Sequence, residues 1–211
     1  MIGSREFESS LKLETERLCL DFTNTVNWHA SHHPVEELPA YTDLLAWAQK
    51  VGLVTAPEAQ RLARQAARRP AEAAAVLERA HALREAIFRL LSATAHRQPV
   101  QPTDLNLINT ELPISLAHSR LVPAAEGYAL RWPAPASADA LDRMLWPVAY
   151  SAADLLTHPE LLGRVGECAD DRGCGYLFLD MTKNRSRRWC DMKDCGNRAK
   201  ARRHYERQKR E

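Results

Sequence analysis

The chain has 211 residues, of which 45% are hydrophobic and 27% are charged, and this composition is ordinary for a folded globular protein. No apolar run approaches the roughly 20 residues that a membrane-spanning helix needs, so the sequence predicts no integral membrane protein. Residues 1–10 lack the apolar stretch of a secretory signal peptide, and the expected location is therefore cytoplasmic.

The charge is distributed unevenly along the chain. Residues 183–211 hold 12 Lys and Arg against 4 Asp and Glu, whereas residues 1–182 hold 17 against 23. An acidic body followed by a strongly basic tail is typical of a nucleic-acid-binding module attached to another domain. A solvated basic tail that only aids solubility is the alternative, and charge alone does not decide between the two.

Apolar residues at helical spacing predict a mainly helical domain over residues 11–160. Residues 18–22 are either a short strand or the start of a helix, and a loop is expected over residues 24–34. Helices are expected over residues 42–51, 57–69, 70–96 and 104–112, with Pro113 ending the last one. A β-hairpin is expected to pair residues 118–122 with 128–132, and a long helix to start at Ser137 and kink at Pro147. The predicted fold class is α+β, mainly α with a small β-sheet.

Four of the five cysteines lie close together in the pattern C-x5-C, fifteen residues, C-x4-C: Cys168, Cys174, Cys190 and Cys195. Two close pairs separated by a short span are typical of a structural zinc site, in which four thiolates complete a tetrahedral shell. Two disulfides are the alternative, which a reducing cytoplasm disfavours. We therefore predict one structural Zn²⁺ bound by these four residues.

The segment around the cysteines is predicted to fold as a small module over residues 164–211. Residues 164–168 and 176–179 are expected to be strands that flank the first cysteine pair. Asn197 is a good N-cap for a helix over residues 198–210. Cysteine pairs combined with a hairpin and a helix after the last ligand predict a treble-clef-like zinc module.

The residues of this module closely resemble the CGNR zinc finger. The resemblance rests on three stretches, CGYLFLD at 174–180, RRWC at 187–190 and CGNR at 195–198. Upstream, LDFTNT at 20–25 and DLLAWA at 43–48 resemble the ABATE domain that usually precedes this finger. The resemblance implies four zinc thiolates, DNA binding and a bacterial family of stress-related transcription regulators.

The predicted terminal helix and the loop before it are rich in basic side chains. Such a surface can neutralise DNA phosphates, although these residues could instead be solvated or paired with the acidic body. The candidate nucleic-acid-binding residues are Arg187, Arg188, Arg198, Lys200, Arg202, Arg203 and Arg207. The expected partners are double-stranded DNA and a small-molecule effector, with a second copy of the chain in a homodimer as a further candidate.

A group of polar residues in the helical domain could bind a small anion or a polar effector: Asp21, Asn24, Asn27 and Arg84. The alternative is a buried hydrogen-bonded network that fixes the loop to a helix. His29, His32 and His33 are interpreted as a surface histidine cluster. No Gly-rich phosphate loop, nucleophile elbow or HExxH helix is present, so no enzyme is predicted.

These observations favour a DNA-binding transcriptional regulator with a structural zinc finger and a ligand-sensing domain. The alternative is a small-molecule-binding protein or enzyme whose zinc module is structural and docks on RNA or on a protein partner.

Overall fold

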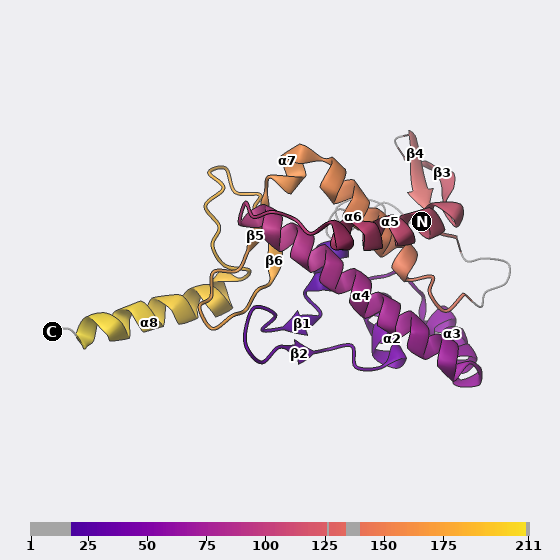
Figure 1. Ribbon diagram of the computed structural model, residues 1–211, viewed down its shortest axis with the longest axis horizontal. Helices are drawn as coiled ribbons and strands as arrows, with labels where there is room; N and C mark the ends of the chain where they lie inside the picture. Colours follow the sequence, from indigo (N-terminus) through magenta and orange to yellow (C-terminus); the bar gives the residue numbers. More distant parts are fainter. Residues whose placement is uncertain (1–17, 126, 134–139, 210–211) are drawn as a thin grey trace.

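A long central helix organises the body of the protein. The computed structural model describes residues 18–125, 127–133 and 140–209, and Figure 1 places α4 (Pro70–Ala95) across the middle of the molecule. Leu83, Ile87 and Leu91 recur every four residues on α4 and are fully buried, which is the pattern of a helix that packs one face against a core. Four further helices surround it: α2 (Tyr41–Lys50), α3 (Ala56–Arg68), α5 (Pro102–Ala117) and α6 (Leu145–Thr157).

Residues 18–23 are helical, which decides between the two expectations for this segment. Its side chains include Cys19 and Phe22, both fully buried in the core. Among the described helices, none is long and apolar enough to cross a lipid bilayer.

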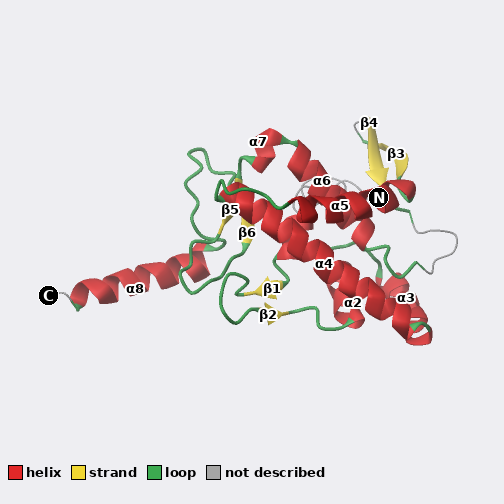
Figure 2. Ribbon diagram, in the orientation of Figure 1, coloured by secondary structure: helices red, strands yellow, loops and turns green. Residues whose placement is uncertain are grey.

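In the described part of the chain, the β structure consists of three separate two-stranded antiparallel sheets rather than one (Figure 2). Strand β1 (Val26–Asn27) pairs with β2 (Val35–Glu36), and β3 (Arg120–Ala124) pairs with β4 (Gly127–Arg131) close to the predicted hairpin. Strand β5 (Val165–Glu167) pairs with β6 (Leu177–Leu179), with Val165 opposite Leu179. The mainly helical fold with little β structure is as predicted.

Two expectations about proline were wrong. Helix α5 continues through Pro113 to Ala117, although proline donates no backbone hydrogen bond. The final turn is held by tertiary contacts, because Ser115 donates from Oγ to the carbonyl of Trp146 and its own carbonyl accepts from Trp132 Nε1 at 2.9 Å. Pro147 lies in the first turn of α6, which begins at Leu145, and a proline is tolerated in that turn without a kink.

The predicted start of that helix at Ser137 falls outside the described residues, since residues 134–139 are not among them. Residues 141–144 form turns instead of a helix.

The C-terminal part begins inside the body and ends outside it. The short helix α7 (Pro159–Leu162) leads into the β5–β6 hairpin, whose Val165, Leu177 and Leu179 are buried in the same core as α4. After β6 the chain forms a loop, a π-helical turn η1 (Met192–Gly196) and helix α8 (Asn197–Gln208). In Figure 1, α8 extends away from all other helices.

The predicted cap of this helix was wrong. Helix α8 begins at Asn197 itself, with Gly196 as its N-cap, and it directly follows η1. The N-cap of η1 is Asp191, whose carboxylate accepts from the backbone N–H of Lys193. The Asn197 side chain donates instead to the carbonyl of Lys193 at 3.0 Å.

Candidate metal centre and nucleic-acid interface

Four cysteines from two parts of the chain meet at one point. Cys168 and Cys174 lie on the turn between β5 and β6, which we call the knuckle (residues 168–175), and Cys190 and Cys195 lie before and within η1. All four sulfur atoms are within 4.8 Å of one another, and the Sγ atom of Cys190 lies 3.7 Å from that of Cys174 and 3.6 Å from that of Cys195. A disulfide would require about 2.05 Å. Tetrahedral zinc–thiolate bonds of about 2.3 Å place the sulfurs roughly 3.8 Å apart, so this geometry fits zinc.

The four thiols influence one another's ionisation. Hydrogen bonds from Cys174 and Cys190 lower the pKa of Cys168 to about 2, whereas interactions with Cys168 and Cys174 raise the pKa of Cys190. Burial raises the pKa of Cys195 as well. Four thiolates this close together repel one another, and a divalent ion such as Zn²⁺ supplies the positive charge that lets all four ionise.

The first cysteine pair is held by the backbone of the knuckle and by aromatic side chains. The backbone N–H of Cys168 donates to the carbonyl of Tyr176 at 2.9 Å, and this bond closes the knuckle. Trp28, Trp189 and the Tyr176 ring pack against the cysteines and cover the sulfur cluster.

The second cysteine pair is held by two guanidinium groups. Arg198 donates from Nη2 to Cys195 Sγ at 2.8 Å. Arg187 donates from Nε to the carbonyl of Trp189 at 3.0 Å and from Nη2 to the carbonyl of Cys190. Both arginines therefore fix the positions of the ligands that precede α8.

A loop of the body, residues 24–31, lies directly on the knuckle, and we call it the docking loop. The backbone N–H of His29 donates to the carbonyl of Cys174 at 3.1 Å. Gly173 and Gly175 have φ values of 84° and 70°, and a Cβ atom on either would lie 2.6 Å from the backbone of Ser31 or Ala30. Only glycine permits both this backbone conformation and this close approach.

The structure places two of the predicted effector residues in this contact. The Asn24 side chain bonds to both backbone groups of Leu177 in β6, donating to its carbonyl and accepting from its N–H, each at 2.9 Å. Asn27 accepts a hydrogen bond from the Tyr176 hydroxyl and donates to Glu37. Both amides therefore join the body to the zinc finger.

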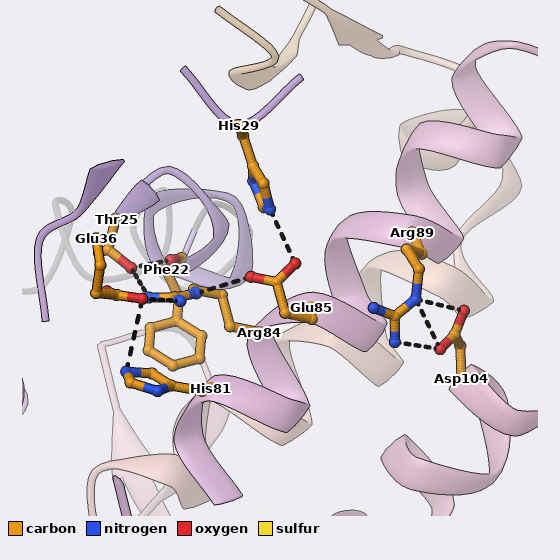
Figure 3. A network of polar contacts seen from close by, with 9 residues as sticks. All are labelled: Phe22, Thr25, His29, Glu36, His81, Arg84, Glu85, Arg89 and Asp104. Carbon is orange, nitrogen blue, oxygen red and sulfur yellow. Dashed lines mark hydrogen bonds and ion pairs between the residues drawn. The ribbon is translucent and has the colours of Figure 1, made fainter. Parts of the chain in front are cut away.

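Arg84 lies in a network of polar contacts that joins α4 to the docking loop and to β2 (Figure 3). Its buried guanidinium donates to Glu36 Oε1 at 2.7 Å, to Thr25 Oγ1 at 3.1 Å and to Glu85 Oε1 at 3.3 Å. Burial opposes ionisation of Glu36, but hydrogen bonds from Arg84 and from the Leu38 N–H outweigh it and lower the pKa of that carboxyl group. Arg84 therefore ties Thr25, which lies between Asn24 and Asn27 in the docking loop, to α4.

Asp21 is exposed and lines a hollow of about 870 Å³ together with Asn24, Trp47, Lys50 and Tyr176.

The interpretation of the histidines as a surface cluster was wrong for His29. Its side chain is 8% exposed, bonds to Glu85 Oε2 at 2.9 Å and stacks on Phe88.

The seven predicted nucleic-acid-binding residues fall into two groups. Three of them have partners within the protein. Arg187 holds the second cysteine pair and lies over the Phe178 ring at 4.4 Å, Arg198 pairs with Asp170 at 2.9 Å, and Arg202 pairs with Asp171. The other four are exposed and have no carboxylate partner within the described part of the chain: Arg188, Lys200, Arg203 and Arg207.

Sequence reasoning missed two parts of this site. Asp170 and Asp171 follow Cys168 closely, so their position on the knuckle could have indicated partners for the basic helix. Trp28 lies 5.0 Å from the guanidinium of Arg172 and 5.3 Å from that of Arg198, ring centre to Cζ. No local pattern in the sequence indicates this contact, because the partners lie near opposite ends of the chain.

Two protein-family profiles match the chain. The ABATE profile, described as "Putative stress-induced transcription regulator", matches residues 16–159, and the CGNR zinc finger profile matches residues 164–208. Neither description names an enzyme. No curated protein matches the chain significantly.

Proposed function

Because the chain belongs to the ABATE family and carries a CGNR zinc finger that holds one structural zinc ion, we propose that it is a DNA-binding transcriptional regulator. In this proposal the finger, residues 164–211, binds duplex DNA in the cytoplasm, and the helical domain, residues 11–160, senses an effector. The zinc ion keeps the four cysteines as thiolates and fixes the start of α8, while the residues of the chain make the contacts with DNA.

The observation that carries the proposal is the exposure and charge of α8. Its 12 residues include five Arg and Lys, and every described side chain from Lys200 to Gln208 is exposed. A helix this short and this polar is marginal by itself, because most helical stability in proteins comes from packing an apolar face. The metal centre anchors its first turn, and a polyanionic partner would supply the countercharge along the rest.

A salt titration tests DNA binding. A fluorescently labelled mixed-sequence duplex is titrated with the zinc-loaded protein between about 50 and 200 mM salt. Affinity falls as the salt concentration rises, and the magnitude of this fall, the slope of log affinity against log salt taken without its sign, increases by about 0.9 for each phosphate contact. Replacing Arg203 and Arg207 together by Ala should lower the slope by about 1.8.

The matched control replaces Arg61 and Arg68, two exposed arginines of α3, by Ala and so makes the same change in net charge. This control should keep the wild-type slope. Weak, salt-independent binding by the wild type would overturn the proposal, and stronger binding to an RNA duplex of equal length would favour the RNA alternative.

The sensing half of the proposal is supported by the position of the 870 Å³ hollow. Its volume falls within the range of about 300–1,000 Å³ that small-molecule sites occupy. Asn24 and Tyr176 line it and also join the body to the finger, so an effector there would contact the joint between the two.

Thermal-shift measurements with a panel of small carboxylates and amines test the sensing role. A compound that raises the Tm of the wild type but not of Lys50→Ala supports it, since Lys50 lines the hollow. Equal shifts in both proteins, or no shift with any compound, would contradict a site at this position.

A further inference from the structure

We infer that only one face of α8 contacts DNA, the face formed by Lys200, Arg203 and Arg207, and that this surface continues onto Arg188 of the preceding loop. We call these four residues the free basic face. The inference rests on the proposed DNA binding and deepens it by assigning the contact to particular side chains.

Helical geometry separates the basic residues of α8 into two groups. At 3.6 residues per turn, Lys200, Arg203 and Arg207 lie within about 60° of one another around the helix. Arg198 and Arg202 lie within about 40° of each other on the opposite side. The helix therefore presents two distinct basic stripes.

The stripe of Arg198 and Arg202 is neutralised by carboxylates. Arg198 donates from Nε and Nη2 to Asp170 Oδ2, at 3.1 and 2.9 Å, and also pairs with Asp194. Arg202 pairs with Asp171 of the knuckle and lies 3.4 Å from Glu206. A phosphate approaching this side would meet four carboxylates and would have to break existing ion pairs, which opposes binding.

The other stripe is exposed and lacks such partners. Within residues 140–209, no carboxylate pairs with Lys200, Arg203 or Arg207, and Arg203 bonds only to the carbonyl of Ala199 on its own helix. These charges are therefore available to phosphates without loss of an ion pair.

Trp189 connects this stripe to the loop before η1. The Arg188 guanidinium lies 5.1 Å from the centre of the Trp189 ring, and that of Arg203 lies 6.0 Å from the same centre. The loop itself is held by the buried Asp180, which accepts from the N–H groups of Thr182 at 2.9 Å and Arg187 at 2.8 Å. Arg188 and Arg203 thus belong to one fixed surface that spans the loop and the helix.

The shape of this surface fits duplex DNA better than duplex RNA. A free helix face that lies away from the body can enter the major groove of B-DNA, which is wide enough for an α-helix. The major groove of A-form RNA is too deep and narrow for such an approach.

Two neighbouring arginines provide a matched test. Arg202→Ala and Arg203→Ala remove the same side chain from adjacent positions of one helix, and both residues are exposed. Each variant and the wild type, with zinc content verified, is titrated with the labelled duplex over a range of salt concentrations. We expect Arg203→Ala to lower the slope by about 0.9 and Arg202→Ala to leave it nearly unchanged. Arg188→Ala should behave like Arg203→Ala.

The outcomes separate this inference from the proposed function. If the wild type binds DNA but Arg202→Ala and Arg203→Ala lower the slope equally, the assignment of one face is wrong and DNA binding stands. If the slope falls more in Arg202→Ala than in Arg203→Ala, the opposite face makes the contact. If the wild type itself binds no duplex at the lowest salt concentration, the proposed function fails before any variant is compared.

Discussion

The two halves of the zinc finger differ in their relation to the rest of the molecule. The first half, β5 to β6, places Leu177 and Leu179 in the core of the helical body, and the docking loop covers its knuckle. The second half, η1 and α8, leaves its basic helix exposed beyond the metal centre. The metal centre thus connects a buried half to an exposed one. Side chains of the finger, which is matched over residues 164–208, therefore pack in the core of the preceding domain.

Loss of the zinc site should have the largest effect, because Cys174 belongs to the buried half and also contacts the body. Cys174→Ser removes one zinc ligand, and structural zinc contributes on the order of 10–16 kcal/mol to the folding of finger peptides. We expect loss of bound zinc, unfolding of η1 and α8, and a lower Tm of the body. Elemental analysis and thermal unfolding followed by circular dichroism measure these changes.

The control for this variant is Cys19→Ala, which changes a fully buried cysteine outside the metal centre and should keep the zinc. A Cys174→Ser protein whose body unfolds at the wild-type temperature would mean that the knuckle does not stabilise the body.

Truncation of a core residue in the buried half should come next in size. Leu177 is 2% exposed, so Leu177→Ala should lower the free energy of unfolding by about 2–5 kcal/mol. Tyr205, in the exposed half, is 57% exposed, and Tyr205→Ala should change the free energy of unfolding by less than about 0.5 kcal/mol. Urea denaturation of both variants measures the difference, and similar values for the two would remove the distinction between the halves.

Removal of the Asn24 side-chain amide, which joins the body to β6, should have a smaller effect. Asn24→Ala leaves the backbone N–H and carbonyl of Leu177 without their present partners, at a cost of about 1–3 kcal/mol. Asn109→Ala, an exposed position on α5, is the control and should be nearly neutral. Denaturant unfolding of the two variants measures both free energies. An equally small effect for Asn24→Ala would indicate that water replaces both hydrogen bonds between Asn24 and Leu177.

The smallest expected effect concerns the ion pair behind the docking loop. The pKa of Glu36 is lowered below its ordinary value of 4.5 in the folded protein, so its ionised form stabilises the fold above that pH. This contribution is lost as the pH falls through the folded pKa. Glu36→Gln should therefore cost about 1 kcal/mol at pH 7, since partial exposure screens the pair, and much less near pH 3.

Stability curves of wild type and Glu36→Gln over this pH range test the assignment. A difference between the two proteins that stays constant from pH 7 to pH 3 would show that the carboxylate charge does not stabilise the fold.

How far the sequence predicts the structure depends on the distance over which each contact forms. The cysteine pairs and the helical spacing of Leu83 and Ile87 are local patterns, and they predicted the metal centre and α4 correctly. The prediction that the helix ends at Pro113 was wrong, because contacts with Trp132 and Trp146 hold the helical turn that follows it.

The docking of the body on the finger could not be predicted from local patterns. Asn24 and Asn27 were recognised as notable polar residues, but their partners Leu177 and Tyr176 lie about 150 residues away in the chain. Similarly, the basic residues of α8 were identified together, whereas their division into a paired and a free face depends on where Asp170 and Asp171 lie in the fold.

Helix α8 is attached to the rest of the protein at one end, where it meets the sulfur cluster. Twelve residues at a rise of 1.5 Å give the helix a length of about 18 Å. A rotation of the helix by about 10° about its attached end would move its far end by roughly 3 Å, which is about the length of one hydrogen bond. A small displacement of the docking loop at the knuckle would thus produce a larger displacement at Arg207, so that the position of this basic side chain depends on the geometry of four sulfur atoms.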